Sequence, residues 1–320
     1  MNLQVTKTIL APVLLAALVV PDAGAADIAA VESRTVTADQ GSRQLNESWQ
    51  IAADARVEIS NIRGSLTVSA WDKAQAELTG NLGADSRLEI SGDAQHLVLR
   101  VDGSKQGWFG SNGPAHDSSL VLRVPRTVAL DADVVSADAT VTGLAGKTLR
   151  VNGVSGNLGV TSGTPDVEIG SVSGDVEFQT MPQTTTTRAH LQTVSGNIGA
   201  KAVSGRVKLE TVSGDIRLDG GVVDELETGT VSGDAQIHAA PGARGQMRLQ
   251  SMSGDIRLRL PESLSAHIEA SSFSGGIHTD FGKVEEKGMG PGSSLDAHVG
   301  NGDAQINAET FSGNIELRRQ

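Results

Sequence analysis

Four aspartates recur at one position of a short repeated phrase and are the first candidates for chemistry. The phrase is an apolar residue, Ser-Gly, usually Asp or Asn, then a second apolar residue, and its aspartates are Asp175, Asp215, Asp234 and Asp255. If the last three lie on successive layers of a stack, like charges about 5 Å apart would favour a bound cation. Calcium needs about six to eight oxygen ligands, however, and each phrase offers one carboxylate. We therefore expect no metal site, with Asp215, Asp234 and Asp255 as weak candidates only, no cofactor, and folding that does not require calcium.

The histidines and serines show no catalytic spacing. Four of the seven histidines, His238, His267, His278 and His298, lie towards the C-terminus, and no pair has the close spacing of a typical zinc site. Stacking of repeats could still bring distant histidines together, although solvated strand positions are the simpler interpretation. The sequence lacks a Gly-x-Ser-x-Gly elbow, and its strand charges are isolated and of mixed sign. We therefore expect a protein that is not an enzyme.

Trp108 and Phe109 form the one adjacent aromatic pair in a chain with three Trp, five Phe and no Tyr. They lie in a Gly- and Ser-rich loop at 102–117, and loops on a rigid scaffold are common binding sites. An exposed aromatic pair suits sugar stacking or a protein contact. Trp108 and Phe109 are the candidate ligand-binding residues, with the alternative that the pair folds back and plugs one end of the structure.

The elements that must position these residues follow from the repeat itself. The phrase serines from Ser155 to Ser274 are spaced by 18, 22, 9, 9, 19, 21 and 21 residues, which indicates a unit of about 20 residues with a half-unit of nine. Each half contains a short alternating strand and a Ser-Gly turn. This predicts an all-β solenoid with coils of about 20 residues, because stacked coils place each phrase on its own kind. An antiparallel β-sandwich is the alternative fold.

The alternation predicts which side chains lie inside. Val207 and Leu209 would point inward and Lys208 outward. We also expect the apolar residue that opens each phrase to form an internal ladder, so that Val212→Asp would be severely destabilising and Arg217→Ala nearly neutral. The predicted internal ladder consists of Val172, Val194, Val212, Val231, Met252 and Phe273.

Composition and the N-terminus place the protein outside the cytoplasm. Lys7, the apolar run 8–20 and Ala23-Gly24-Ala25 are typical of a secretory signal peptide over residues 1–25. The chain has no Cys and a formal net charge of −12, which excludes disulfides and disfavours nucleic acid as a partner. We expect a periplasmic, cell-surface or secreted protein without a transmembrane segment.

We expect residues 26–130 to form an N-terminal β region, either degenerate coils or a cap, and residues 131–320 to form the β-solenoid repeat domain. The first part contains all three tryptophans and alternating strands but only a faint repeat. A second insertion, 282–294, interrupts the C-terminal coils. Terminal repeats of a solenoid are expected to be atypical.

The chain resembles the bacterial putative adhesin family, exported β-solenoid proteins of largely unknown function. The resemblance rests on the segment 57–72 (VEISNIRGSLTVSAWD), on Leu122-Arg123-Val124-Pro125 and on the tandem Val-Ser-Gly-Asp phrases. It implies a right-handed parallel β-helix and brings no catalytic residue.

Together these observations predict an exported, non-enzymatic β-solenoid that acts in adhesion, scaffolding or partner binding in the cell envelope. Its partner would be an envelope protein or a glycan. Two alternatives stay open: a carbohydrate-active enzyme on a parallel β-helix, and an envelope-stress accessory protein that binds a periplasmic partner. Clustered carboxylates in a cleft would favour the enzyme.

Overall fold

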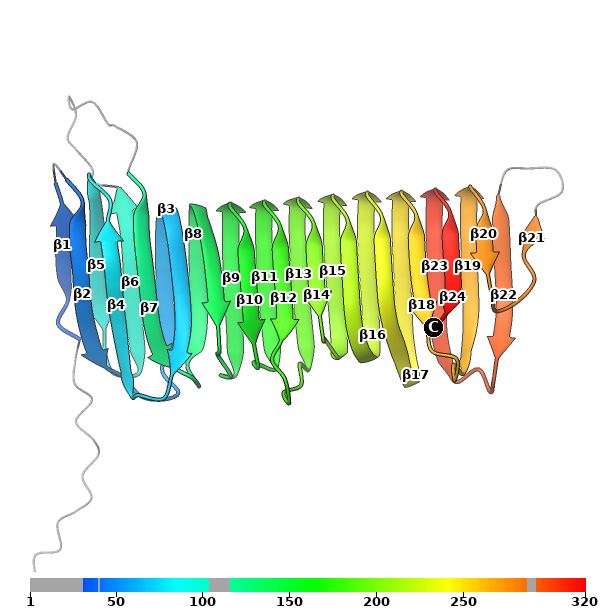
Figure 1. Cartoon of the computed structure of the whole chain (residues 1–320), viewed down its shortest axis with the longest axis horizontal. Helices are drawn as coiled ribbons and strands as arrows, with labels where there is room; N and C mark the ends of the chain where they lie inside the picture. The colour runs from blue at the N-terminus through cyan, green and yellow to red at the C-terminus, as the bar shows by residue number, and fades with distance from the viewer. Residues whose placement is uncertain (1–30, 40, 104–115, 287–291) are drawn as a thin grey trace, which may run out of the picture.

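The computed structural model describes residues 31–39, 41–103, 116–286 and 292–320. These residues form 24 β-strands and no helix, and Figure 1 shows the strands side by side across the long axis of a rod. No helix in this part of the chain is long and apolar enough to cross a membrane.

The first seven strands form one end of the rod: β1 (Arg34–Ala38), β2 (Arg43–Gln50), β3 (Arg56–Trp71), β4 (Gln75–Leu82), β5 (Ser86–Gly92), β6 (His96–Gly103) and β7 (Ser118–Pro125). The central strands are β8 (Ala129–Thr142), β9 (Thr148–Ser155), β10 (Leu158–Ser162), β11 (Asp166–Ser173), β12 (Val176–Thr180), β13 (Arg188–Ser195), β14 (Ile198–Lys201), β15 (Gly205–Ser213), β16 (Ile216–Ser232), β17 (Ala235–Ser253) and β18 (Ile256–Leu260). The last strands are β19 (Ala266–Ser274), β20 (Ile277–Thr279), β21 (Glu285–Glu286), β22 (Ser293–Val299), β23 (Ala304–Ser312) and β24 (Ile315–Arg319).

The repeated phrase sets the register of the central strands. These strands pair in parallel, and the phrase serines other than Ser204 lie beside one another on neighbouring coils, as Ser195 does beside Ser213. The strand that follows the turn pairs in the same way, with Ile198 beside Ile216. Parallel stacking of equivalent residues confirms an all-β, solenoid-like repeat and not an antiparallel sandwich.

The core lies between the strands that precede the Ser-Gly turns and the strands that follow them. Val207, Leu209 and Ile216 are at most 2% exposed, as the alternation predicts. The buried apolar side chains form one continuous cluster from Val31 to Leu317, so the N-terminal strands and the repeats share a core.

The predicted internal ladder is wrong. The side chains of Val172, Val194, Val212, Val231, Met252 and Phe273 are between 44% and 60% exposed. Successive side chains of a strand point to opposite faces. Because Leu209 and Thr211 are buried, Val212 must point outward. The inward apolar residue is the one that closes each phrase, such as Ile216, so we no longer expect Val212→Asp to be severely destabilising.

Coil order at the C-terminal end differs from chain order. β23 pairs with β17 on one side and with β19 on the other, and β24 pairs with β18 and β20. The last coil of the chain therefore lies between two earlier coils, as the red strands between yellow and orange ones show in Figure 1. Outside β19, β22 adds an antiparallel strand, and β21 pairs with β22.

The N-terminal end has a similar arrangement. β3 pairs in parallel with β8 and, on its other edge, with β6 and β7. β5 then pairs antiparallel with β6, and β4 pairs antiparallel with β7. At the outer edge, β1 pairs with β5 and β2 pairs with β4. The segment that precedes the clear repeats is thus joined to them through β3.

Candidate functional site

Nine exposed apolar side chains form a continuous row along the rod, which we call the exposed apolar ladder. Each lies at the opening position of a phrase, and the strand registers place each beside the next. These nine are all but one of the large apolar side chains exposed in the described residues, the other being Val222. In stacking order the ladder is Val135, Val154, Val172, Val194, Val212, Val231, Met252, Phe311 and Phe273.

The ladder ends in an aromatic pair. The rings of Phe311 and Phe273 stack with centroids 4.8 Å apart and planes 9° from parallel. This contact exists because β23 lies beside β19, although 38 residues separate the two rings in the chain. The largest apolar surfaces of the ladder therefore gather at its C-terminal end.

An open groove of about 1030 Å³ runs beside the ladder. The ladder residues from Val172 to Phe273 form one side. The neighbouring outward row is small or polar, and includes Gln192, Glu210 and Gly229. A continuous apolar row that borders a groove is a surface of the kind that binds other molecules, whereas single exposed apolar residues carry no such meaning.

The aspartate row has a structural role in the stack. Asp215, Asp234 and Asp255 lie on successive coils. The backbone N–H of Asp234 donates to Oδ1 of Asp215 at 2.9 Å, and the N–H of Asp255 donates to Oδ1 of Asp234 at 2.9 Å. Asparagines take the same role, since Asn197 Oδ1 accepts from the N–H of Asp215 at 2.9 Å. Either side chain supplies the needed oxygen, which explains why Asp and Asn interchange in the phrase.

Arg257 offsets the charge of this row. Its guanidinium donates to Asp234 at 2.7 Å and to Asp255 at 2.8 Å. Partial burial raises the pKa of Asp234, but the N–H of Asp255 and the guanidinium of Arg257 lower it more, so the net pKa lies below the ordinary value. The carboxylate oxygens of Asp234 are thus already engaged by donors.

We expect Asp234 to contribute to the acid sensitivity of the fold. Its pKa is lower in the folded state, so its stabilising effect is complete above the unfolded-state value of about 3.9. This effect is lost as the pH falls through the lower folded value. The melting temperature of the wild type should therefore fall more between pH 6 and pH 3 than that of Asp234→Asn, which keeps the acceptor for Asp255. An equal fall in melting temperature in the two proteins would contradict a role of Asp234 in acid sensitivity.

The second group predicted from the sequence, Trp108 and Phe109, lies outside the described residues. The exposed apolar ladder was missed as a surface because its residues were assigned to the interior. Strict counting of the alternation from Leu209 would have placed Val212 outside.

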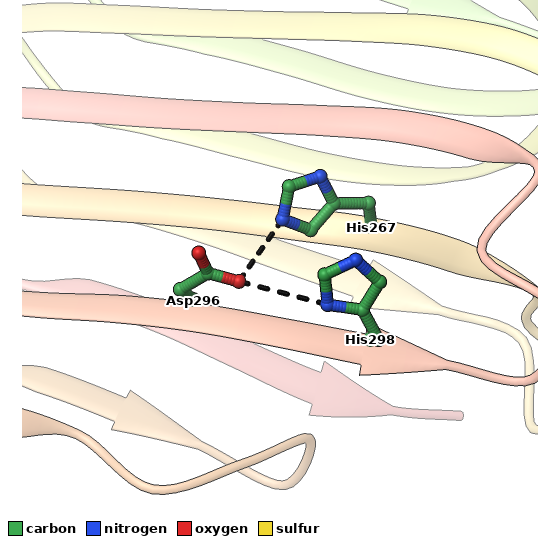
Figure 2. Close-up of side chains that lie close together, drawn as sticks. All are labelled: His267, Asp296 and His298. Atoms are coloured by element: carbon green, nitrogen blue, oxygen red, sulfur yellow. Dashed lines mark hydrogen bonds and ion pairs between the residues drawn. The ribbon is translucent and has the colours of Figure 1, made fainter.

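A cluster of two histidines and an aspartate was also missed. In Figure 2, His267 and His298 lie side by side and both face Asp296. His267 lies directly opposite His298 in the antiparallel pair β19–β22, and their rings stack with centroids 4.1 Å apart. Among the described residues, this is the group whose side chains lie close enough to hold a metal ion together.

Fold and surface together define an all-β, solenoid-like repeat protein with one exposed apolar ladder. Residues 46–318 match the sequence model of the Toastrack DUF4097 family, and the chain therefore belongs to that family.

Three solved structures of putative adhesins are similar to this chain. One from Parabacteroides merdae ATCC 43184 is 13% identical, with 87% of this chain and 98% of that chain covered and a TM-score of 0.48. One from Bacteroides fragilis NCTC 9343 is 12% identical, with 87% and 99% covered and a TM-score of 0.43. One from Parabacteroides distasonis ATCC 8503 is 9% identical, with 88% and 100% covered and a TM-score of 0.43. No curated protein matches the chain.

Proposed function

We propose that this chain is an exported, non-enzymatic β-solenoid that binds a protein partner in the bacterial cell envelope through the exposed apolar ladder. The observation that carries this proposal is the ladder itself, which leaves nine large apolar side chains in contact with water along one line. Fully burying an exposed valine side chain contributes about 1.5–3 kcal/mol, and a ladder residue, which is about half exposed, would gain roughly half of that. A partner that covers several ladder residues therefore gains substantial binding energy.

The chemistry of the ladder favours a protein over a glycan. Valine and methionine side chains have no strong donor or acceptor, whereas sugar hydroxyls need hydrogen-bonding groups and aromatic faces. Phe311 and Phe273 stack on each other, which occupies one face of each ring. An apolar stripe on a partner protein matches such a row better than a polysaccharide does.

The outward charges support a binding role over catalysis. Two carboxylates line the groove: Glu210 pairs with Lys208 at 3.1 Å, and Glu309 accepts from the side-chain amide of Gln250 at 3.5 Å. Glu210 lies on β15 and Glu309 on β23, with β16 and β17 between them. Glycoside hydrolysis needs two carboxylates that face one substrate bond. Carboxylates at separate points of a face instead interact with solvent and with side chains on the same or a neighbouring strand.

Export and coil geometry complete the proposal. The basic and apolar segments at 1–25 support cleavage of a signal peptide and release into the envelope. We take the coils to be right-handed, because connections between parallel strands of a sheet are right-handed in almost all proteins. We take each coil to contain about 20 residues, because most phrase serines recur at about that spacing.

Photocrosslinking in the bacterium that expresses the protein tests this function. With p-benzoylphenylalanine at position 212, we expect a light-dependent adduct with one envelope protein. The same group at position 217, which is outward on the other run of the same coil, should give none. With the purified partner, the double variant Val212→Ser and Val231→Ser should bind at least about tenfold more weakly, because two apolar contacts are lost.

Three results would overturn the proposal. Equal adducts at positions 212 and 217 would show that the ladder is not a specific surface. An adduct with twice the mass of the chain would show that the ladder binds a second copy. Degradation of purified polysaccharides by the protein would show that it is an enzyme.

The melting temperature of the double serine variant should equal that of the wild type, since both valines are about half exposed.

A further inference from the structure

The antiparallel pair β19–β22 brings four potential metal ligands onto one outward face. His267 pairs with His298, and two residues along, Glu269 pairs with Asp296. Residues two apart on a strand share a face, so the four side chains form a square of two imidazoles and two carboxylates. Among the described residues, no other pair of strands carries two histidines and two carboxylates at paired positions.

The ligand atoms of three of these residues already converge. Nε2 of His267 lies 3.0 Å from Oδ1 of Asp296, and Nδ1 of His298 lies 3.7 Å from the same oxygen. The ligand atoms of the three residues all lie within 4.8 Å of one another. A tetrahedral zinc ion with bonds of about 2.0–2.2 Å separates its ligand atoms by roughly 3.3–3.5 Å. The two imidazoles, whose planes now lie 20° apart in a stack, would have to rotate out of that stack to direct both nitrogens at one ion.

We propose that His267, His298 and Asp296 bind a divalent transition-metal ion such as Zn²⁺ at the C-terminal end of the rod. Glu269, whose Oε1 lies 3.9 Å from Nε2 of His267, supplies the fourth ligand or leaves that position to water. Two imidazoles and a carboxylate suit zinc and its neighbours in the first transition series, whereas calcium and magnesium select oxygen. The exposed positions of Asp296 and His298 give the ion direct access from solvent.

Metal binding would have a defined structural effect. Asp296 and His298 belong to β22, and His267 belongs to β19, so one ion joins the outer strand to the coil beneath it. A ligand that binds only the folded state raises the melting temperature. Zn²⁺ would thus stabilise the end of the stack where β22 covers β19.

Titration of the untagged mature protein with Zn²⁺ tests the site. Isothermal calorimetry should show one equivalent bound, and Co²⁺ should give a visible absorption band from the same site. His298→Ala and Asp296→Asn should each weaken Zn²⁺ binding by at least about tenfold, because loss of even an outer-shell partner costs 10–100-fold. Zn²⁺ should raise the melting temperature of the wild type but not of these variants.

His238→Ala is the matched control. His238 also pairs with a carboxylate, Asp219, at 3.1 Å, but on a different coil and without a second histidine at that place. This variant should bind Zn²⁺ as the wild type does. Equal affinity in the wild type, His298→Ala and Asp296→Asn, or no binding by the wild type, would overturn the proposal. Circular dichroism of the variants without metal should match the wild type, since the replaced side chains are exposed.

Discussion

Replacement of Leu209 by alanine is expected to lower the free energy of unfolding by about 2–5 kcal/mol, the range for buried leucines. Leu209 is fully buried in β15, where its neighbours across the strands are Leu191 and Thr228. The coils above and below hold its surroundings in place through parallel pairing, so the cavity left by the lost methyl groups cannot close freely. Urea unfolding followed by circular dichroism measures the change.

Val212→Ala, three residues further along the same strand, is the control for Leu209→Ala. Val212 is 47% exposed on the outer face, so its truncation should change the free energy of unfolding by less than about 1 kcal/mol. The two variants thus test the inward position of Leu209, which the sequence predicts, and the outward position of Val212, where the structure reverses the prediction. A similar loss of unfolding free energy in both variants would mean that the Val212 side chain is packed against other residues in the free protein.

The architecture could be predicted because its causes are local. A strand of alternating residues and a Ser-Gly turn are visible in each phrase, and stacking of equal phrases follows from their regular spacing. Triplets such as Val207-Lys208-Leu209 show the inward face correctly. The error at Val212 arose because a conspicuous apolar residue was taken to be buried, although alternation from Leu209 assigns it to the outside.

The order of the coils could not be predicted, and the reason is the repeat itself. Most phrases can pair with one another, because they present the same Ser-Gly turn and an Asp or Asn oxygen to the neighbour; the phrase at Phe273, with Gly276 at that position, is an exception. Asp255 illustrates this, since its Oδ1 accepts from the N–H of Asn314 at 2.8 Å, 59 residues further along the chain.

The histidine cluster was hidden for a different reason, the return of an antiparallel strand. His267 and His298 are 31 residues apart, and they meet because β22 runs back along β19 in the antiparallel direction. The composition of 282–294 indicates an insertion and gives no ground for a returning strand after it. The pattern Asp296-x-His298 opposite His267-x-Glu269 becomes visible only when the two strands are aligned.

Gly214→Ala is expected to be as damaging as the loss of a core leucine. Gly214 occupies the corner of its phrase with φ of 152°, a conformation that L side chains rarely adopt. An added Cβ would lie 1.9 Å from the carbonyl oxygen of Gly196, the corner glycine of the coil beneath. The backbone term costs about 1–2 kcal/mol, and overlap in a packed region costs about 1–3 kcal/mol more.

The overlap at Gly214 cannot be relieved locally, because both partners are backbone atoms fixed by pairing with adjacent coils. The N–H of Gly214 also donates to the carbonyl oxygen of Ser232 at 3.0 Å, so a shift of the corner weakens the next coil as well. Gly229→Ala is the matched control, since its added Cβ meets no atom within 4 Å. It should be neutral or stabilising by up to about 1 kcal/mol. If thermal melts show the same stability for Gly214→Ala and Gly229→Ala, the corner glycines do not set the spacing of the coils.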